Sequence, residues 1–296
     1  MNAPVTTPMN RTPQTGRGRA RLPGAKRLRD GHSIYWWAEI LGVVAFYLVY
    51  SAIRNSVNQN EGLAFDHARE LIGWQRSLGI YFEPTVQDWA LHFRPLVVVM
   101  NYIYGSLHFV VTAGVGAYLF LRWANDYPRW RNTLAITTSI ALIGFFSWPL
   151  MPPRLLPGSF GYVDTLAKYP TLWSFNSGQM AKLSNQFAAM PSVHCAWALF
   201  CACALIPRLE HTWAKVLAGL YPVLTVAAIV LTGNHYWLDA IGGFAIFGVG
   251  YAGGRLFTRA GRGRPASEPV REPPVLDPPV LGSRGPGRSV PGREAS

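Results

Sequence analysis

Residues 213–232 read WAKVLAGLYPVLTVAAIVLT, an apolar run in which Lys215 is the one charged residue. A run of about 20 apolar residues is long enough to cross the hydrocarbon core of a bilayer as a helix. The whole chain has a similar character, since 50% of its residues are hydrophobic and 14% are charged, whereas about 25% are charged in a soluble globular protein. The composition therefore predicts an integral membrane protein and argues against a soluble Rossmann or barrel enzyme.

Similar runs recur along the chain and predict an all-α integral membrane protein, built as a six-transmembrane-helix bundle. The six predicted spanning helices cover residues 34–53, 96–121, 133–151, 190–207, 213–232 and 236–257. The fourth and the sixth are the least apolar, because Ser192, His194 and Asp239 interrupt them. The predicted catalytic membrane domain extends over residues 33–258.

Two polar segments flank this domain. Residues 1–32 are rich in Arg, Pro, Thr and Gly, and residues 259–296 alternate Pro, Arg and Gly. Neither composition can bury a core, so both segments are predicted to be disordered tails. Much of the net charge of +12 lies in them, so any contact with nucleic acid would be confined to the tails. No nucleic acid and no obligate protein partner is expected.

The basic residues of the connecting segments predict an orientation. Lys and Arg are concentrated in the N-terminal tail, in residues 122–132 and 208–215, and after the last span. All four segments lie on one side of a six-span topology, and Lys and Arg are enriched in cytoplasmic loops. Both termini of this multi-pass protein are therefore predicted to be cytoplasmic, with the plasma membrane as its location and the segments 54–95 and 152–189 outside.

The outer segment 54–95 contains apolar residues between charged ones from Asp66 to Leu78. This pattern fits a helix that lies on the outer surface of the membrane, and it fits an ordinary solvated loop equally well.

Three polar clusters fall at the predicted outer face: Pro152–Arg154, Met190–His194 and Gly233–Asp239. In the second cluster, Pro191 is expected in the first turn of a helix. Ser192 and His194 would then lie at the free N–H groups and the positive dipole end, which favour a phosphate. The simpler interpretation is that Ser192 caps the helix and that His194 lies among headgroups without a catalytic part.

His235 and Asp239 are four residues apart, so on a helix they share one face and the carboxylate can orient the imidazole. A histidine held in this way is a candidate nucleophile or base, and the alternative is a structural polar pair at a helix end. Arg154 offers a planar donor set that matches phosphate oxygens, although alone it also fits a snorkelling interfacial arginine. Arg94 and Lys182, on the same side, are further candidates for binding phosphate.

Two other ionisable residues fall inside predicted spans. His108 would lie about 18 Å below the outer end of the second span at a rise of 1.5 Å per residue. Glu39 would lie near the cytoplasmic end of the first span. Both are expected to bond between helices or to reach the interface, and neither is expected to take part in catalysis.

The order Arg154, Pro191-Ser192-Val193-His194 and His235-x-x-x-Asp239 resembles the three-part signature of the type 2 phosphatidic acid phosphatase superfamily, whose membrane members have six spans. The sequences 188–194 and 233–236 look most similar to its inositol phosphorylceramide synthase-related branch. The resemblance covers roughly residues 60–255 and leaves both tails out.

This resemblance implies a role for each residue. His235 would attack phosphorus and form a phosphohistidine, and Asp239 would orient it. His194 would protonate the leaving oxygen. Ser192 and Arg154 would hold phosphate oxygens, as the chemistry of phosphoryl transfer requires positive charge around the phosphate and a proton for the departing alkoxide.

The sequence departs from the signature at two places. The superfamily has a lysine seven residues before an Arg-Pro pair, whereas here Gln87 precedes Arg94 at that spacing, and Ser147 precedes Arg154, which no proline follows. The superfamily also has an arginine six residues before the last histidine, where this chain has Ile229. The expected phosphate site therefore has fewer cations than usual, which bears on the substrate more than on the reaction.

These features predict a membrane-embedded phosphatase or phosphotransferase that acts on lipid phosphates or phosphodiesters at the outer leaflet, through a phosphohistidine and without a metal or other cofactor. Hydrolysis and transfer differ in whether water or an alcohol attacks the intermediate. Two alternatives stay open. One is a metal-dependent hydrolase with a site built from His194, His235 and Asp239, and the other is a transporter or scaffold that binds anionic headgroups.

Overall fold

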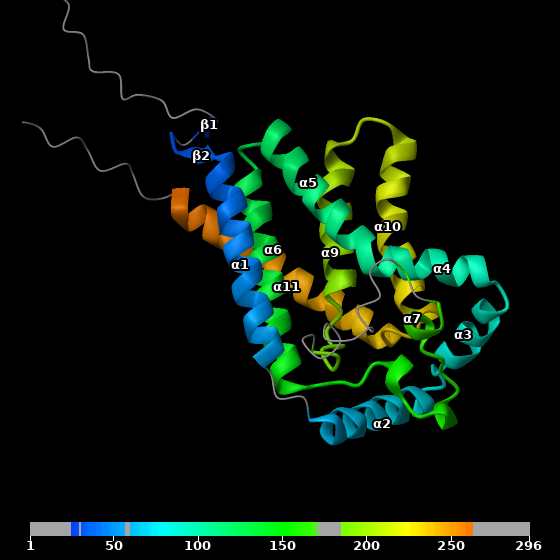
Figure 1. Ribbon diagram of the computed structural model, residues 1–296. Helices are drawn as coiled ribbons and strands as arrows, with labels where there is room; N and C mark the ends of the chain where they lie inside the picture. Colours follow the sequence, from blue (N-terminus) through cyan, green and yellow to red (C-terminus); the bar gives the residue numbers. More distant parts are fainter. Residues whose placement is uncertain (1–24, 30, 57–59, 170, 172–184, 263–296) are drawn as a thin grey trace, which may run out of the picture.

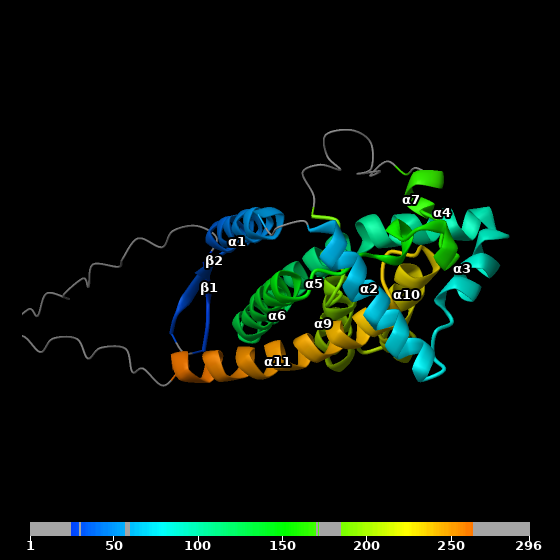
Figure 2. The same cartoon turned by 90° about the horizontal axis from the view of Figure 1, so that it is seen from below.

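The computed structural model describes residues 25–29, 31–56, 60–169, 171 and 185–262, and these are almost entirely helical. Long helices run side by side, and shorter helices form a layer across one end of them (Figures 1 and 2). Four stretches of the described chain are long and apolar enough to cross a membrane: α1 (Trp36–Ser56), the continuous helix Arg94–Arg122, α10 (Thr212–Leu231) and most of α11 (Trp237–Arg262). The chain is thus an all-α integral membrane protein.

Two more helices run beside these four, at the places of the third and fourth predicted spans (Figure 1). They are α6 (Tyr127–Ser147) and α9 (Val193–Leu205), which continues as the short η4 (Ile206–Arg208). The predicted boundaries shift, because Pro128 lies in the first turn of α6 and Ser192 caps α9. At the other end of the chain, α11 continues to Arg262, past the predicted domain boundary at residue 258.

The N-terminal tail is ordered at its end, contrary to the prediction for residues 1–32. Strand β1 (Ala25–Arg27) pairs antiparallel with β2 (Ser33–Tyr35) directly before α1. The Lys26 ammonium donates to the carbonyl of Leu121 at 2.8 Å. The Lys26 side chain thus bonds to the end of a spanning helix, which composition alone does not indicate. The rest of that tail, and the tail from residue 263 onward, lie outside the described residues.

Close packing of α6 against α11 holds the centre of the bundle. Gly250 and Gly254 of α11 face Thr137 and Thr133 of α6, and a Cβ atom at either glycine would collide with the facing threonine. Small residues four apart allow membrane helices to approach closely. The hydroxyl of Thr133 is satisfied within its own helix, where it donates to the carbonyl of Arg129 at 3.0 Å.

The layer at the end of the bundle is built from α2 (Glu61–Ser77), α3 (Glu83–Leu91) and α7 (Thr165–Lys168). The side chain of Asn60 caps α2 by accepting from the N–H of Leu63 at 3.1 Å. One face of α2, which includes Ala64, Ala68, Leu71 and Ile72, is buried against Leu150, Met151 and Tyr236. The helical alternative for residues 66–78 is therefore confirmed, and the solvated loop is wrong.

The second span bends. It consists of α4 (Arg94–Tyr102), the π-helical turn η1 (Ile103–Leu107) and α5 (His108–Arg122), and α4 runs at an angle to α5 (Figure 1). π-turns interrupt the regular α-helical ladder and bend helices, frequently at functional sites. The span expected at residues 96–121 is thus present as one continuous helix, Arg94–Arg122, and the bend in it changes where His108 lies.

Candidate active site

His235 and Asp239 are brought together by the turn that joins α10 to α11. Gly233 enters this turn with a φ of 67°, a left-handed conformation that glycine adopts without strain. The Nδ1 atom of His235 lies 3.2 Å from Oδ2 of Asp239, and the same oxygen accepts the N–H of Tyr236 at 3.0 Å. Asp239 is fully buried. His235 lies just before α11 and not on it, yet the expected pairing is present.

Ser192 and His194 open α9 beside this pair. The N–H of Ser192 donates to the carbonyl of Asp239 at 2.9 Å, which ties the start of α9 to the first turn of α11. The hydroxyl of Ser192 is the N-cap of α9 and accepts from the N–H of Cys195 at 3.5 Å. Pro191 therefore precedes the cap and does not lie in the first turn as expected. The rings of His194 and His235 are 5.5 Å apart between centroids.

A third histidine lies at the same place. The ring of His108 is 4.2 Å from that of His194 between centroids, and Tyr104 stacks on the other side of His194 at 4.4 Å. His108 thus lies beside His194, directly after the π-turn at which the second span bends, and its expected non-catalytic role stays a prediction. Glu39 behaves as expected, since it bonds between helices, to Arg131 at 2.7 Å and to Tyr127 at 3.0 Å.

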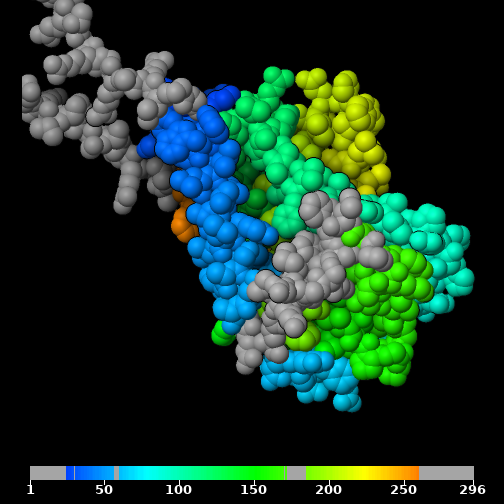
Figure 3. Space-filling model, viewed as in Figure 1, coloured from blue at the N-terminus to red at the C-terminus, as the bar shows by residue number. Residues whose placement is uncertain are grey.

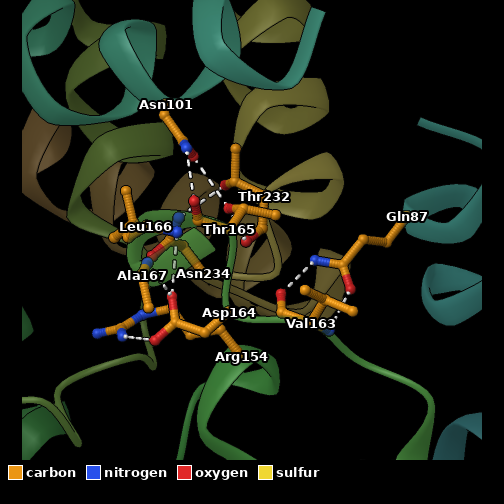
Figure 4. Close-up of polar contacts among 10 residues, drawn as sticks. All are labelled: Gln87, Asn101, Arg154, Val163, Asp164, Thr165, Leu166, Ala167, Thr232 and Asn234. Carbon is orange, nitrogen blue, oxygen red and sulfur yellow. Dashed lines mark hydrogen bonds and ion pairs between the residues drawn. The ribbon is translucent and has the colours of Figure 1, made fainter. Parts of the chain in front are cut away.

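Arg154 follows α6 in the short helix η2 (Pro153–Leu155), and two contacts fix it (Figure 4). Its backbone N–H donates to the carbonyl of Gly233 at 2.7 Å, and its Nη1 atom lies 3.1 Å from Oδ2 of Asp164. The other oxygen of Asp164 caps α7 by accepting from the N–H groups of Leu166 and Ala167. Because the cap of α7 fixes Asp164, the ion pair holds the guanidinium of Arg154 next to the turn that bears His235.

A network of neutral side chains holds the segment that carries Asp164 in place (Figure 4). The buried amide of Gln87 makes two bonds to the backbone of Val163, accepting from its N–H at 2.9 Å and donating to its carbonyl at 3.1 Å. The Thr165 hydroxyl lies 2.9 Å from the carbonyl of Thr232 and 3.0 Å from the amide oxygen of Asn101. Gln87, which stands where the family signature has lysine, thus positions the loop that carries Asp164.

The two other candidate cations are placed differently. Arg94 is the first residue of α4, is exposed, and lies over the ring of Tyr169 with 5.9 Å between its Cζ atom and the ring centroid. It is not among the described residues that line the cavity containing the histidines. Lys182 lies outside the described residues.

A cavity of about 530 Å³ joins these residues. His108, His194, His235 and Arg154 line it together with Arg54, from the last turn of α1, and no Asp or Glu is among its described lining residues. The surface is hollowed between α1 and α5 (Figure 3). The lining is positively charged, as an anion site requires. Sequence reasoning missed Arg54, although its place at the outer end of the first span was a signal.

A metal site finds no support in the geometry. Within the described ranges, no three His, Cys, Asp or Glu side chains are grouped so that they could hold a metal ion. The alternative that used His194, His235 and Asp239 as ligands therefore has no preformed ligand set. The Asp239 carboxylate is turned to His235 and to the backbone of Tyr236 instead.

Comparison with known proteins shows the family of the chain. No curated protein and no solved structure matches the chain. Residues 69–253 match the PAP2 superfamily, and this segment includes the histidines, Asp239, Ser192 and Arg154. Since the match covers more than half of the sequence, the chain belongs to the PAP2 superfamily, the type 2 phosphatidic acid phosphatase superfamily that its motifs resemble.

Proposed function

We propose that this protein is a membrane-embedded phosphatase or phosphotransferase that acts on lipid phosphates or phosphodiesters through a phosphohistidine intermediate. Membership of the superfamily supports phosphatase-type activity on lipid phosphates. The observation that carries the proposal is that His235 lines the cavity while its ring is held by the buried Asp239, and that the described lining includes arginines and histidines and no carboxylate. The positive charge of such a lining attracts a phosphate, and its described residues include no negative charge that would repel one.

The proposed reaction uses the two nitrogen atoms of His235 differently. Nδ1 is held by Asp239 at 3.2 Å, so Nε2 is the atom that attacks phosphorus. The N–P bond forms as the bond from phosphorus to the ester oxygen breaks, and His194, 5.5 Å away between ring centroids, gives its proton to that oxygen. In the second step His194 takes the proton of water or of an alcohol, whose oxygen attacks phosphorus; the N–P bond breaks, His235 is regenerated, and free phosphate or a phosphate ester leaves. Arg154 neutralises charge on the equatorial oxygens.

Ser192 has a smaller part in this proposal than the sequence suggested. Its hydroxyl caps α9. The group that favours the phosphate is then the N-terminal end of this helix, which carries a partial positive charge. Two N–H groups in the first turn and the ring of His194 then face the substrate from one element. Because Ser192 also bonds to the backbone of Asp239, it sets the position of His194 relative to His235.

We further propose the six-span topology, with α6 and α9 as the third and fourth spans, both termini in the cytoplasm and the active site at the outer leaflet of the plasma membrane. The position of α6 and α9 beside the four long apolar helices supports it (Figure 1). Within the superfamily, the sequences around His194 and His235 favour the inositol phosphorylceramide synthase-related branch.

The test is a screen of purified protein in detergent against lipid phosphates and phosphodiesters, with and without alcohol acceptors. We expect release of phosphate or headgroup by the wild type, and neither turnover nor an acid-labile phosphoenzyme in the His235→Ala variant. Full activity of that variant would refute the mechanism. Turnover that is lost on exhaustive chelation and restored by metal would favour a metal enzyme, and binding of lipid phosphate without any turnover would favour a scaffold or transporter.

A further inference from the structure

Helix α1 contributes one face to the cavity. Tyr47, Tyr50, Ser51 and Arg54 all line it, and their spacing of three and four residues places them on one side of the helix. Most other residues of α1 are exposed, Ile40, Leu48 and Val49 among them, as expected of a helix surrounded by lipid. Tyr47 reaches across to Phe109 of α5, with 6.2 Å between ring centroids. The first span is therefore a wall of the site as well as a membrane anchor.

The end of α1 is fixed to the catalytic segment of the chain. The side-chain amide of Asn185 donates to the carbonyl of Arg54 at 3.2 Å, and its backbone N–H donates to the side chain of Asn55 at 3.4 Å. Asn185 is buried, and its side chain also accepts from the N–H of Phe187. The residues that follow lead directly into Ser192 and His194. Arg54 thus has a defined position relative to His194.

The guanidinium of Arg54 is on the cavity side of α1. Arg54 is half-buried, and it lines the cavity together with Tyr104 and His194, which belong to other helices. An arginine at the last turn of a helix is also favoured by the helix dipole, and a snorkelling arginine would extend into the headgroups and away from the bundle. Arg54 lines the same cavity as His194, and neither the interaction with the helix dipole nor snorkelling requires that position.

We propose that Arg54 binds the phosphate of the substrate, as a second guanidinium opposite Arg154. This inference rests on the proposed function, since it assigns a residue to the same site. Arg154 approaches from the loop after α6 and shares its charge with Asp164 at 3.1 Å, so it supplies only part of the positive charge that a phosphate dianion needs. Arg54 supplies the rest from α1, which precedes the segment 69–253 that matches the superfamily.

Phosphate binding can be measured without turnover. Inorganic phosphate that binds the folded protein raises the midpoint of thermal unfolding in detergent, and a titration at constant ionic strength gives the concentration of half-maximal effect. Removing one charged hydrogen-bonding partner costs about 10- to 100-fold in affinity. We expect the Arg54→Ala variant to need about 10- to 100-fold more phosphate than the wild type, and the Arg54→Lys variant to recover part of the loss because it keeps the charge.

Arg76→Ala is the matched control. Arg76 lies in the last turn of α2, at the same end of the bundle, with its guanidinium 4.9 Å from the ring centroid of Tyr81 and outside the cavity. This variant removes an equal charge and should titrate like the wild type. If Arg54→Ala does not unfold cooperatively, Arg54→Lys and Arg54→Gln are compared instead, and the glutamine variant should bind phosphate more weakly.

The outcomes separate the two proposals. An unchanged phosphate titration in Arg54→Ala, or an equal loss in Arg76→Ala, overturns the role of Arg54 and leaves the phosphohistidine mechanism intact. Wild-type protein that does not respond to phosphate overturns the phosphate site itself. Wild-type protein that binds phosphate in an Arg54-dependent way, but turns over no lipid phosphate or phosphodiester, overturns the proposed function and supports the role of Arg54 in anion binding.

Discussion

Asp239 acts through a single oxygen atom in the proposed mechanism, because its Oδ2 meets both the His235 ring and the N–H of Tyr236. Asp239→Asn keeps the shape but removes the charge that stabilises an imidazolium and selects its tautomer. We expect kcat to fall by about 10⁴, as in other histidines deprived of an orienting carboxylate, while KM changes far less. Steady-state kinetics check this, and an unchanged thermal midpoint would show that the fold persists. Weaker binding with unchanged kcat would contradict the assigned role.

His108 is expected to position His194, whose ring it meets at 4.2 Å between centroids. A group that aids the acid matters most when the leaving oxygen is a poor leaving group. His108→Phe keeps an aromatic ring there, and it should slow the cleavage of an alkyl phosphate by about tenfold or more, with a much smaller effect on p-nitrophenyl phosphate. The ratio of the two rates is the measurement. Equal slowing of both substrates would indicate a general packing defect.

These two residues illustrate what sequence can reveal at this scale. The pairing of His235 with Asp239 is local, since four residues separate them, and a spacing rule predicts it. His108 and Arg54 reach the site only because one helix bends at a π-turn and another packs beside it. Such placement depends on tertiary structure, so spacing along the chain indicated neither the contact of His108 with His194 nor the place of Arg54 in the cavity lining.

At the scale of elements, the approach of α6 to α11 depends on glycine. A side chain at Gly250 would collide with Thr137, whereas a Cβ atom at Gly248 meets nothing within 4 Å. Overpacking of a tight contact costs about 1–3 kcal/mol. We expect Gly250→Leu to lower the midpoint of thermal unfolding in detergent, and Gly248→Leu, on another face of the same helix, to leave it near the wild-type value. Equal midpoints for the two variants would contradict this view of the interface.

The boundaries of a helix could be predicted where a local pattern in the sequence marks its ends. The apolar run from residue 213 predicts α10 almost completely, because α10 covers Thr212–Leu231. The helix α2 was one of two open alternatives, and burial of its apolar face against Tyr236 decides between them. The hairpin of residues 25–35 had no such signal. Its order comes from contacts with the ends of other helices, such as that of Lys26 with Leu121.

At the scale of the whole molecule, the proposed orientation rests on the distribution of Lys and Arg, and the structure offers a direct test. Ser159 and Glu210 are exposed, the first between α6 and α9 and the second between α9 and α10. The α9–α10 connection lies at the opposite end of the bundle from the segment that follows α6 (Figure 1). Of the three native cysteines, Cys195 and Cys201 are buried, with 0% and 1% of their surface exposed, and Cys203 is partly exposed, so the background labelling to be measured is that of Cys203. Cysteine substitutions at the two exposed positions therefore report which end faces the cell exterior.

We expect a membrane-impermeant maleimide to label the Ser159→Cys variant in intact cells, and the Glu210→Cys variant only after the membrane is permeabilised. The reason is that Lys and Arg gather in the connections on the Glu210 side, including Arg208 and Lys215. Unsubstituted protein is the control for the native cysteines. The reverse labelling pattern would place the cavity at the cytoplasmic leaflet. The substrate would then come from that leaflet, while the chemistry of His235, Asp239 and His194 would stand unchanged, because none of their contacts depends on which side of the membrane they face.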